Sequence, residues 1–256
     1  MRVSALPDQA PERVLAQHKG VVDEVCRIAR LSCTWVPAPS YEALVDQLGQ
    51  GAIDVAFLGG VTFAQARHRY GAVPLAMRDI DFAFTSVILV RADDSARGLA
   101  DLRGRRFAFG NRISTSGHYM PRYFLQRQGI IPERAFSSVV FSGGHDATMR
   151  MIADGRVDAG AVNGSLAYAA LASGDSAARR LRVLWRSPPY TDYVWAARPG
   201  LPADVSSRLQ NAFLDLDLSQ PAQRAALERE GAGGYVPPDP DEFDQIADIL
   251  RERGQL

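Results

Sequence analysis

RFAFGNRISTSG, residues 106–117, is the stretch that decides the fold. Residues 106–110 form a strand-like run, and an apolar helical pattern follows over residues 119–128. Between them, residues 114–117 bring three hydroxyls and several backbone N–H groups to the N-terminus of a helix. Unpaired N–H groups and the helix dipole attract negative charge, so this arrangement binds an anion without a charged side chain. The stretch predicts a strand–turn–helix unit that captures a small tetrahedral oxyanion.

An ordinary helix cap is the alternative interpretation of this turn, because Ser and Thr are favoured at that position. One hydroxyl satisfies a cap, whereas Ser114, Thr115 and Ser116 supply three in succession. We therefore favour anion binding. Pro121 must then lie in the first helical turn, where its missing N–H costs little.

Short apolar strands alternate with helical patterns along most of the chain, which predicts an α/β fold with largely parallel sheets. The predicted strands are residues 3–6, 33–37, 55–58, 73–77, 84–90, 106–109, 138–141, 159–162, 183–186 and 193–197. The predicted helices are residues 12–29, 41–48, 62–70, 119–128, 147–153, 166–171, 203–216 and 239–253. Ligands of open α/β folds bind at the carboxyl ends of parallel strands, so the loops after the strands form the candidate binding region.

An internal repeat indicates two lobes rather than one sheet. Residues 51–60 and 155–164 both run from a Gly-x-(Ile/Val)-Asp turn through a strand to a small-residue loop and a helix. Coincidence is the alternative, since strand–turn–helix units reuse the same residues. We expect crossings near residues 90–93 and 187–192, giving lobe 1 as 1–90 with 193–256 and lobe 2 as 91–192. Loops from both sheets then line one cleft.

Composition excludes several classes of function. The 256 residues carry 29 basic and 29 acidic side chains and show no basic stripe, so nucleic acid is not an expected partner. The one lysine, Lys19, has no glycine-rich turn before it, which excludes a P-loop and makes a Schiff base improbable. No apolar run reaches transmembrane length and no signal peptide opens the chain. We expect a cytosolic protein or one whose targeting segment is missing from this chain.

Two cysteines, Cys26 and Cys33, match neither a zinc nor a redox spacing. We expect two buried thiols, with a disulfide as the alternative for an exported chain.

A second polar loop, residues 143–146, follows the predicted strand at 138–141 with the letters GGHD. The glycines allow close backbone approach, and His145 at the start of a helix is placed to donate a hydrogen bond to an oxyanion. Asp146 is then expected to fix the histidine tautomer or to cap the helix. A capped helix with a half-exposed histidine is the alternative. No second histidine lies four residues on, so we expect no metal site.

Further candidates come from lobe 1 and the second crossing. Tyr41 opens a helix that Ser40 is expected to cap, and Gly60 precedes another helix. Asp192 and Tyr193 lie on the second crossing. A carboxylate beside an oxyanion selects a partly protonated form, because Asp192 then accepts the ligand's proton. A solvated loop carboxylate is the alternative.

Catalytic signatures are absent: the chain has no Gly-x-Ser-x-Gly elbow, no His-Glu-x-x-His and no Gly-x-Gly-x-x-Gly. Ser114 and His145 form one candidate nucleophile–base pair, without a recognisable third partner. A hydrolase of small phosphoryl compounds is therefore an alternative function.

Four groups of motifs occur in one order along the chain: DVAFLGG at 54–60, STSG at 114–117, GGHD at 143–146 with GRVDA at 155–159, and WRSP at 185–188. Together they resemble the phosphate/phosphite/phosphonate-binding proteins of ABC importers, over nearly the whole chain to about residue 237. The resemblance implies a type II periplasmic binding protein with two α/β lobes, a ligand cleft and a two-strand hinge. It implies a non-enzymatic monomer without metal or cofactor that closes on a small oxyanion and delivers it to a membrane permease. The expected location is the periplasm, with the leader absent from this chain, or the cell surface through a lipid anchor.

The resemblance also assigns residues. Ser114, Thr115, Ser116 and His145 would hold the oxyanion, and Asp192, Tyr193 and Tyr41 would contribute from the hinge and first lobe. Relatives that take aminoalkyl phosphonates place a glutamate where this chain has residues 163–165, Asn-Gly-Ser, which argues against an amino-bearing ligand.

Other branches of the family leave an alternative role open. The run RDID at 78–81 and the glycine pair at 59–60 resemble a branch that takes selenate-like oxyanions. Further relatives sense arsenite beside a histidine kinase. The alternative to transport is therefore an oxyanion sensor subunit that signals to a membrane kinase.

Overall fold

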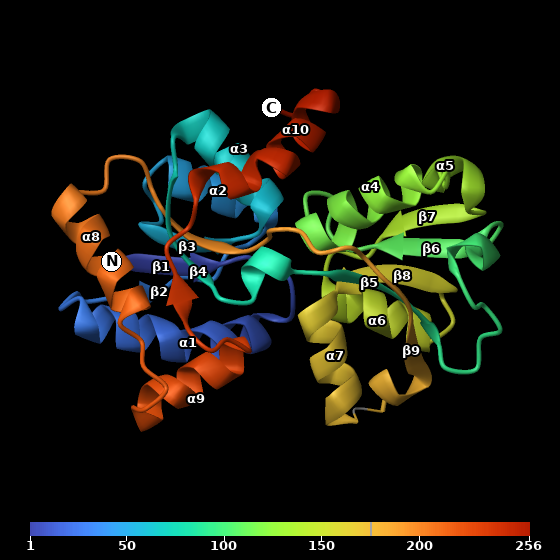
Figure 1. Cartoon of the computed structure of the whole chain (residues 1–256), viewed down its shortest axis with the longest axis horizontal. Coiled ribbons are helices and arrows are strands. Elements are labelled where there is room, and N and C mark those ends of the chain that lie inside the picture. Colours follow the sequence, from blue (N-terminus) through green and yellow to red (C-terminus); the bar gives the residue numbers. More distant parts are fainter. Residues whose placement is uncertain (175) are drawn as a thin grey trace. The chain divides into compact units, whose positions relative to one another are not determined.

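The computed structural model describes residues 1–174 and 176–256 and divides into two compact units (Figure 1). Unit 1 comprises Met1–Ala83 and Tyr190–Leu256, and unit 2 comprises Phe84–Pro189. The second crossing, between Pro189 and Tyr190, lies within the predicted 187–192, whereas the first, between Ala83 and Phe84, lies earlier than the predicted 90–93. The reason is β5 (Ser86–Arg91), which we expected in lobe 1 but which pairs with two strands of unit 2.

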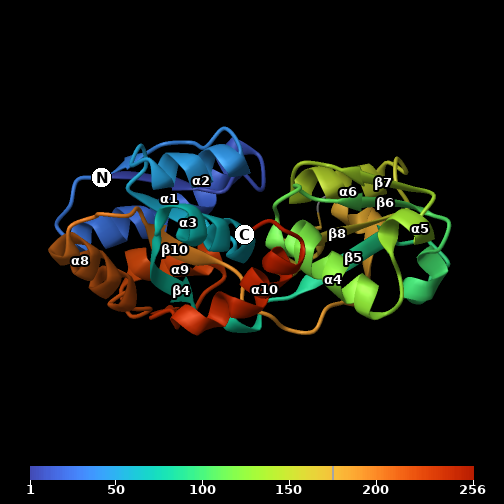
Figure 2. The same cartoon turned by 90° about the horizontal axis from the view of Figure 1, so that it is seen from above.

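Unit 1 is built on a six-stranded mixed sheet with the order β11-β4-β10-β3-β1-β2. Its strands are β1 (Arg2–Ala5), β2 (Thr34–Trp35), β3 (Val55–Leu58), β4 (Val73–Arg78), β10 (Val194–Ala197) and β11 (Tyr235–Val236). Its helices are α1 (Pro11–Ile28), α2 (Tyr41–Gly49), α3 (Gly60–Tyr70), α8 (Ala203–Leu214), α9 (Pro221–Glu230) and α10 (Asp244–Glu252). α1 and α9 lie on one side of the sheet and α2, α3 and α10 on the other, and both chain ends belong to this unit (Figures 1 and 2).

Unit 2 is built on a five-stranded sheet with the order β7-β6-β8-β5-β9. Its other strands are β6 (Arg106–Phe109), β7 (Ser138–Phe141), β8 (Ala159–Asn163) and β9 (Leu181–Arg186). Its helices are α4 (Met120–Arg127), α5 (Pro132–Ala135), α6 (His145–Ala153) and α7 (Gly164–Ser173). β6 runs parallel to β7 and β8, whereas β5 is antiparallel to β8 and β9.

Alternating side chains of the unit 2 strands explain why helices cover both faces of its sheet. Phe107 and Phe109 point into one buried cluster with Leu125 of α4, and Ala108 between them points into another cluster with Ile152 of α6. A strand buried on both faces is apolar, which is the run FAF at residues 107–109, whereas Arg106 at the start of β6 is exposed. The loops after β6, β7 and β8 consequently share one edge of this sheet.

The internal repeat has a structural counterpart in both units. Asp54 accepts hydrogen bonds from the backbone and side chain of Arg2, and Asp158 accepts the same pair from Arg106. Burial raises the pKa of Asp54, but the hydrogen bonds from Arg2 and Arg198 outweigh it and hold the pKa at about 2. The hydrogen bond from Arg106 likewise lowers the pKa of Asp158. In each unit the carboxylate therefore ties the turn before one strand to the neighbouring strand.

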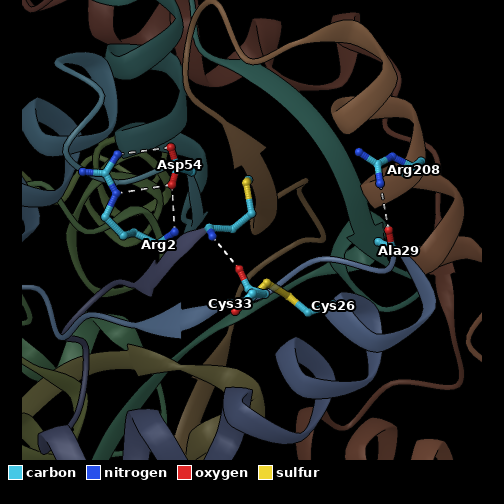
Figure 3. The surroundings of a disulfide bond; sticks show 8 residues. Arg2, Cys26, Ala29, Cys33, Asp54 and Arg208 are labelled. Carbon is cyan, nitrogen blue, oxygen red and sulfur yellow. Dashed lines mark hydrogen bonds and ion pairs between the residues drawn. A yellow bond between two sulfur atoms is a disulfide. The ribbon is translucent and has the colours of Figure 1, made fainter.

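The expectation of two buried thiols is wrong. Cys26, near the end of α1, forms a disulfide with Cys33, just before β2, across a Cα–Cα distance of 6.2 Å (Figure 3). The bond ties the last turns of α1 to the sheet of unit 1. Such bonds persist in oxidising compartments, which is the exported alternative weighed above.

Among the described α-helices and strands, three lie outside the predicted set: α5, α9 and β11. The predicted C-terminal helix begins as a 3-10 turn, Pro240–Phe243, and continues as α10. Within the described residues, no helix combines the length and apolar character needed to cross a membrane.

Candidate functional site

The turn after β6 is wider than an ordinary helix start. Ser114 has extended backbone angles (φ −74°, ψ 131°), and its Oγ accepts a hydrogen bond from the Gly117 N–H at 3.0 Å. Thr115–Tyr119 then forms a π-helical turn that continues into α4. Ser114 is thus the helix cap, and the helical backbone begins at Thr115 rather than at the predicted residue 119. Single π turns are rare and are frequent at functional sites.

Pro121 explains the geometry of this turn. It has no N–H, so the carbonyls of Ser116 and Gly117, which lie five and four residues before it, lose their usual helical donors. Both carbonyls are paired from outside the helix. The Gly110 N–H donates to the Gly117 carbonyl at 2.9 Å, and the Ser86 hydroxyl donates to the Ser116 carbonyl at 2.8 Å.

The Ser116 hydroxyl is the most informative atom of the turn. Its side chain is buried, with 1% of the residue exposed, yet among residues 1–174 and 176–256 its Oγ has no hydrogen-bond partner. A buried polar atom of this kind is costly and is uncommon in native proteins. The first N–H groups of a helix also lack intrahelical partners. The start of this turn therefore presents donors suited to an anion.

His145 lies against the same turn. It is the first residue of α6 and is 1% exposed, so the alternative of a half-exposed histidine is wrong. A Cβ placed on Gly117 would come within 3.1 Å of His145 Cε1, which puts the ring directly beside the backbone of the turn. The loops after β6 and β7 thus bring Ser116 and His145 together.

A backbone amide of β8 fixes the tautomer of His145. Its Nδ1 accepts a hydrogen bond from the Asn163 N–H at 3.3 Å, and an amide N–H can only donate. The proton of the ring therefore lies on Nε2, which makes that atom a donor. We expected Asp146 to fix the tautomer or to cap the helix. Its carboxylate accepts from the Ala147 N–H in the first turn of α6, whereas the cap position is Gly144, without a side-chain cap.

A further histidine, which the sequence reasoning did not consider, supports the loop. His118 Nδ1 is 2.6 Å from the Arg112 carbonyl, and its Nε2 accepts from Arg122 Nε at 2.9 Å. Arg122 in turn pairs with Glu133, and that hydrogen bond lowers the pKa of Glu133. The chain of contacts anchors residue 112 just before the turn at residues 114–117. Its one sequence signal was the position of His118 immediately after Gly117.

In unit 1 the structure joins two of the four candidates, Gly60 and Asp192. The Gly60 N–H, at the start of α3, donates to Asp192 Oδ1 at 2.9 Å. Asp192 is fully buried, so the alternative of a solvated loop carboxylate is wrong. The residue before α3 is Gly59, which has no side chain to cap the helix, and Asp192 performs that function from far along the chain.

Tyr193 and Tyr41 are also buried in unit 1. The Tyr193 ring stacks on Phe57 at 5.0 Å, and its hydroxyl donates to Asp8 at 3.3 Å. Asp8, after β1, was not predicted, although its place after the first strand was a usable signal. Tyr41 is the first residue of α2, and the expected cap is confirmed, since Ser40 Oγ accepts from the Ala43 N–H. Within the described chain no three His, Cys, Asp or Glu side chains gather to form a metal centre.

Comparison with known proteins identifies the family. A family model described as "ABC transporter, phosphonate, periplasmic substrate-binding protein" matches residues 3–243. The chain belongs to this family. Its members are substrate-binding proteins rather than enzymes, located in the periplasm, that bind a small ligand and work with a membrane permease.

Individual relatives agree over most of the chain. A probable ABC transporter phosphite binding protein, PhnD1, of Prochlorococcus marinus is 28% identical over 100% of this chain and 90% of its own length. The phosphate-import protein PhnD of Mycolicibacterium smegmatis is 27% identical over 90% of this chain and 74% of its own. The structure of Prochlorococcus PhnD1 in complex with methylphosphonate superposes with a TM-score of 0.93, covering 100% of this chain and 98% of that one. The expected type II periplasmic binding fold is confirmed.

Proposed function

We propose that this chain binds a phosphonate- or phosphite-like oxyanion and delivers it unchanged to an ABC importer. The buried Ser116 hydroxyl without a protein partner, at a helix start, carries the proposal. The family and the methylphosphonate complex of PhnD1 support it.

The chemistry of the unit 2 cluster suits such a ligand. Ser116 Oγ and His145 Nε2–H are hydrogen-bond donors from two neighbouring loops, and the helix start adds a favourable dipole. All of these donors are uncharged, so affinity depends on the number and direction of hydrogen bonds rather than on an ion pair. A tetrahedral oxyanion presents acceptor lone pairs in several directions and so satisfies donors from two loops at once.

The proposal includes the absence of turnover. A nucleophilic serine needs a base that accepts its proton. The Ser114 hydroxyl accepts from the Gly117 N–H and caps the turn. The acceptor nitrogen of His145, Nδ1, already accepts from the Asn163 N–H, so this ring is not placed to take a proton from Ser114, which favours binding over hydrolysis by a Ser114–His145 pair.

Unit 1 is proposed to supply the second set of contacts in the ligand-bound form. Its candidates are Asp192 and Tyr193, with Tyr41 and Gly60 from the starts of α2 and α3. The Asp192 carboxylate favours an oxyanion that carries a proton, because a carboxylate accepts from a P–OH group and repels a bare dianion. Asn163, at the end of β8, brings no negative charge for an amino-bearing ligand.

Calorimetric titration with methylphosphonate, phosphite, phosphate, selenate and arsenite tests the proposal. We expect binding of a phosphorus oxyanion, weakened by about 1–3 kcal/mol in Ser116→Ala, because a buried donor to an anion is lost. Ser173→Ala, which removes an exposed hydroxyl elsewhere in unit 2, is the matched control and should bind like the native chain. Phosphorus NMR of the recovered ligand should show no product. No heat with any phosphorus oxyanion would contradict the proposal, and tight binding of arsenite or selenate alone would favour the sensor alternative.

A further inference from the structure

Ser86 is a fully buried residue at the start of β5 that no motif drew attention to. Its hydroxyl donates to the Ser116 carbonyl at 2.8 Å, and its N–H donates to Ser187 Oγ at 3.0 Å. Its carbonyl accepts from the Ser187 N–H at 2.9 Å. Through its side chain and its backbone, Ser86 thus links the anion-binding turn to Ser187, the residue after β9.

The Ser116 carbonyl depends on this hydroxyl because the helix offers it no donor. In the π turn the Met120 N–H bonds the Thr115 carbonyl, so the next donor in register would be the N–H of residue 121. Residue 121 is proline and has none. Without Ser86, the carbonyl would be buried and unpaired, which is costly.

The consequence is a peptide group held at both ends. The peptide between Ser116 and Gly117 has its carbonyl fixed by Ser86 and its N–H fixed by Ser114 Oγ at 3.0 Å. Because a peptide is planar, the two bonds define its orientation. That orientation in turn sets the direction of the Ser116 side chain, the donor proposed for the ligand.

Ser86 is also connected to His145, the second proposed donor, through a neighbouring strand. Ser86 is paired with Asn163 across β5 and β8, and the Asn163 N–H is the group that bonds His145 Nδ1. On its other side, Ser187 stands two residues before Pro189, where the chain leaves unit 2. Ser86 therefore contacts the peptide that carries Ser116 and pairs with the strand residue that holds His145. It also bonds Ser187, near the end of unit 2.

We propose that Ser86 is a positioning residue for anion binding: it replaces the N–H missing at Pro121 and so orients the Ser116 hydroxyl. The inference rests on the proposed function for its affinity readout. Its structural part, the orientation of the Ser116–Gly117 peptide, is measurable without any ligand.

Two readouts test the inference. In the unliganded protein, Ser86→Ala should shift the Gly117 amide resonance and accelerate its hydrogen exchange, because the peptide loses one of its two anchors. In calorimetry with methylphosphonate, the same variant should bind about three- to tenfold more weakly, the cost of one lost hydrogen bond. Unchanged Gly117 exchange together with native affinity would overturn the inference.

A rescue separates positioning from general destabilisation. Pro121→Ala restores an N–H five residues after Ser116, so Ser86→Ala/Pro121→Ala should return to within about twofold of the affinity of Pro121→Ala alone. Tyr235→Phe removes the buried hydroxyl that accepts from Trp195 in unit 1, and should lower the melting temperature while leaving the affinity native. Failure of the double variant to recover, with the single variant weakened, would overturn the inference. Native protein that binds no oxyanion but whose Gly117 exchange responds to Ser86→Ala would instead overturn the proposed function alone.

Discussion

At the residue scale, Gly117 allows the capping hydroxyl of Ser114 and the His145 ring to lie close to the same backbone. A Cβ at this position would lie 2.9 Å from Ser114 Oγ and 3.1 Å from His145 Cε1, both closer than ordinary contact. Gly117→Ala should therefore displace the capping hydroxyl or the imidazole, lower the unfolding free energy by about 1–3 kcal/mol and weaken anion binding. Urea unfolding and calorimetry measure the two effects.

A matched glycine gives the control for this substitution. A Cβ on Gly98, in the same unit, would meet nothing within 4 Å. Gly98→Ala should therefore unfold and bind like the native chain. Native affinity in Gly117→Ala would show that anion binding does not depend on the present position of His145.

The local sequence predicts the position of some site residues but not the contacts that others make. The hydroxyls of the turn and the place of His145 at a helix start follow from local patterns, and both were predicted. The tautomer of His145 depends on an amide of β8, and the burial of Asp192 depends on α3, which lies 132 residues away along the chain at Gly60. Such contacts are set by tertiary packing, so no local pattern contains them.

At the element scale, most strands and helices were predicted because apolar runs and small-residue loops mark them locally. The sequence did not predict which sheet each strand joins. The strand β5 was compatible with either lobe, and only its pairing with β8 and β9 places it in unit 2. The prediction for the two cysteines was wrong for a similar reason. The sequence shows two cysteines seven residues apart, but only the fold shows that α1 ends beside the start of β2.

The repeated Arg–Asp element predicts a dependence of stability on pH. Arg2 and Arg198 hold the pKa of Asp54 at about 2, below its ordinary value near 3.8. A carboxyl whose pKa is lowered by folding stabilises the native state above its unfolded pKa, and this contribution is lost as pH falls towards its folded pKa. The unfolding free energy should therefore decrease between about pH 4 and pH 2.

Urea unfolding as a function of pH measures this dependence. Asp54→Asn, which keeps the shape without the charge, should be less stable at pH 7 and should show a shallower decrease in acid. Asp158→Asn in unit 2 is the parallel test, because Arg106 lowers the pKa of that carboxyl too. Identical pH profiles in both variants and the native chain would show that neither pair contributes.

At the scale of the whole molecule, the chain passes between its units twice, between Ala83 and Phe84 and between Pro189 and Tyr190. A ligand that contacts residues of both units stabilises both together, by about 2.7 kcal/mol at a concentration one hundred times its Kd. Saturating methylphosphonate should therefore slow amide exchange in residues 115–120 of unit 2 and also at Gly60 and Asp192 of unit 1. Ser116→Ala, measured at the same ligand concentration, should lose the protection in both units, because the two sets of contacts share one ligand. Protection confined to residues 115–120 would show that the anion is held by unit 2 alone, and that Asp192 serves as the cap of α3 and not as a ligand contact.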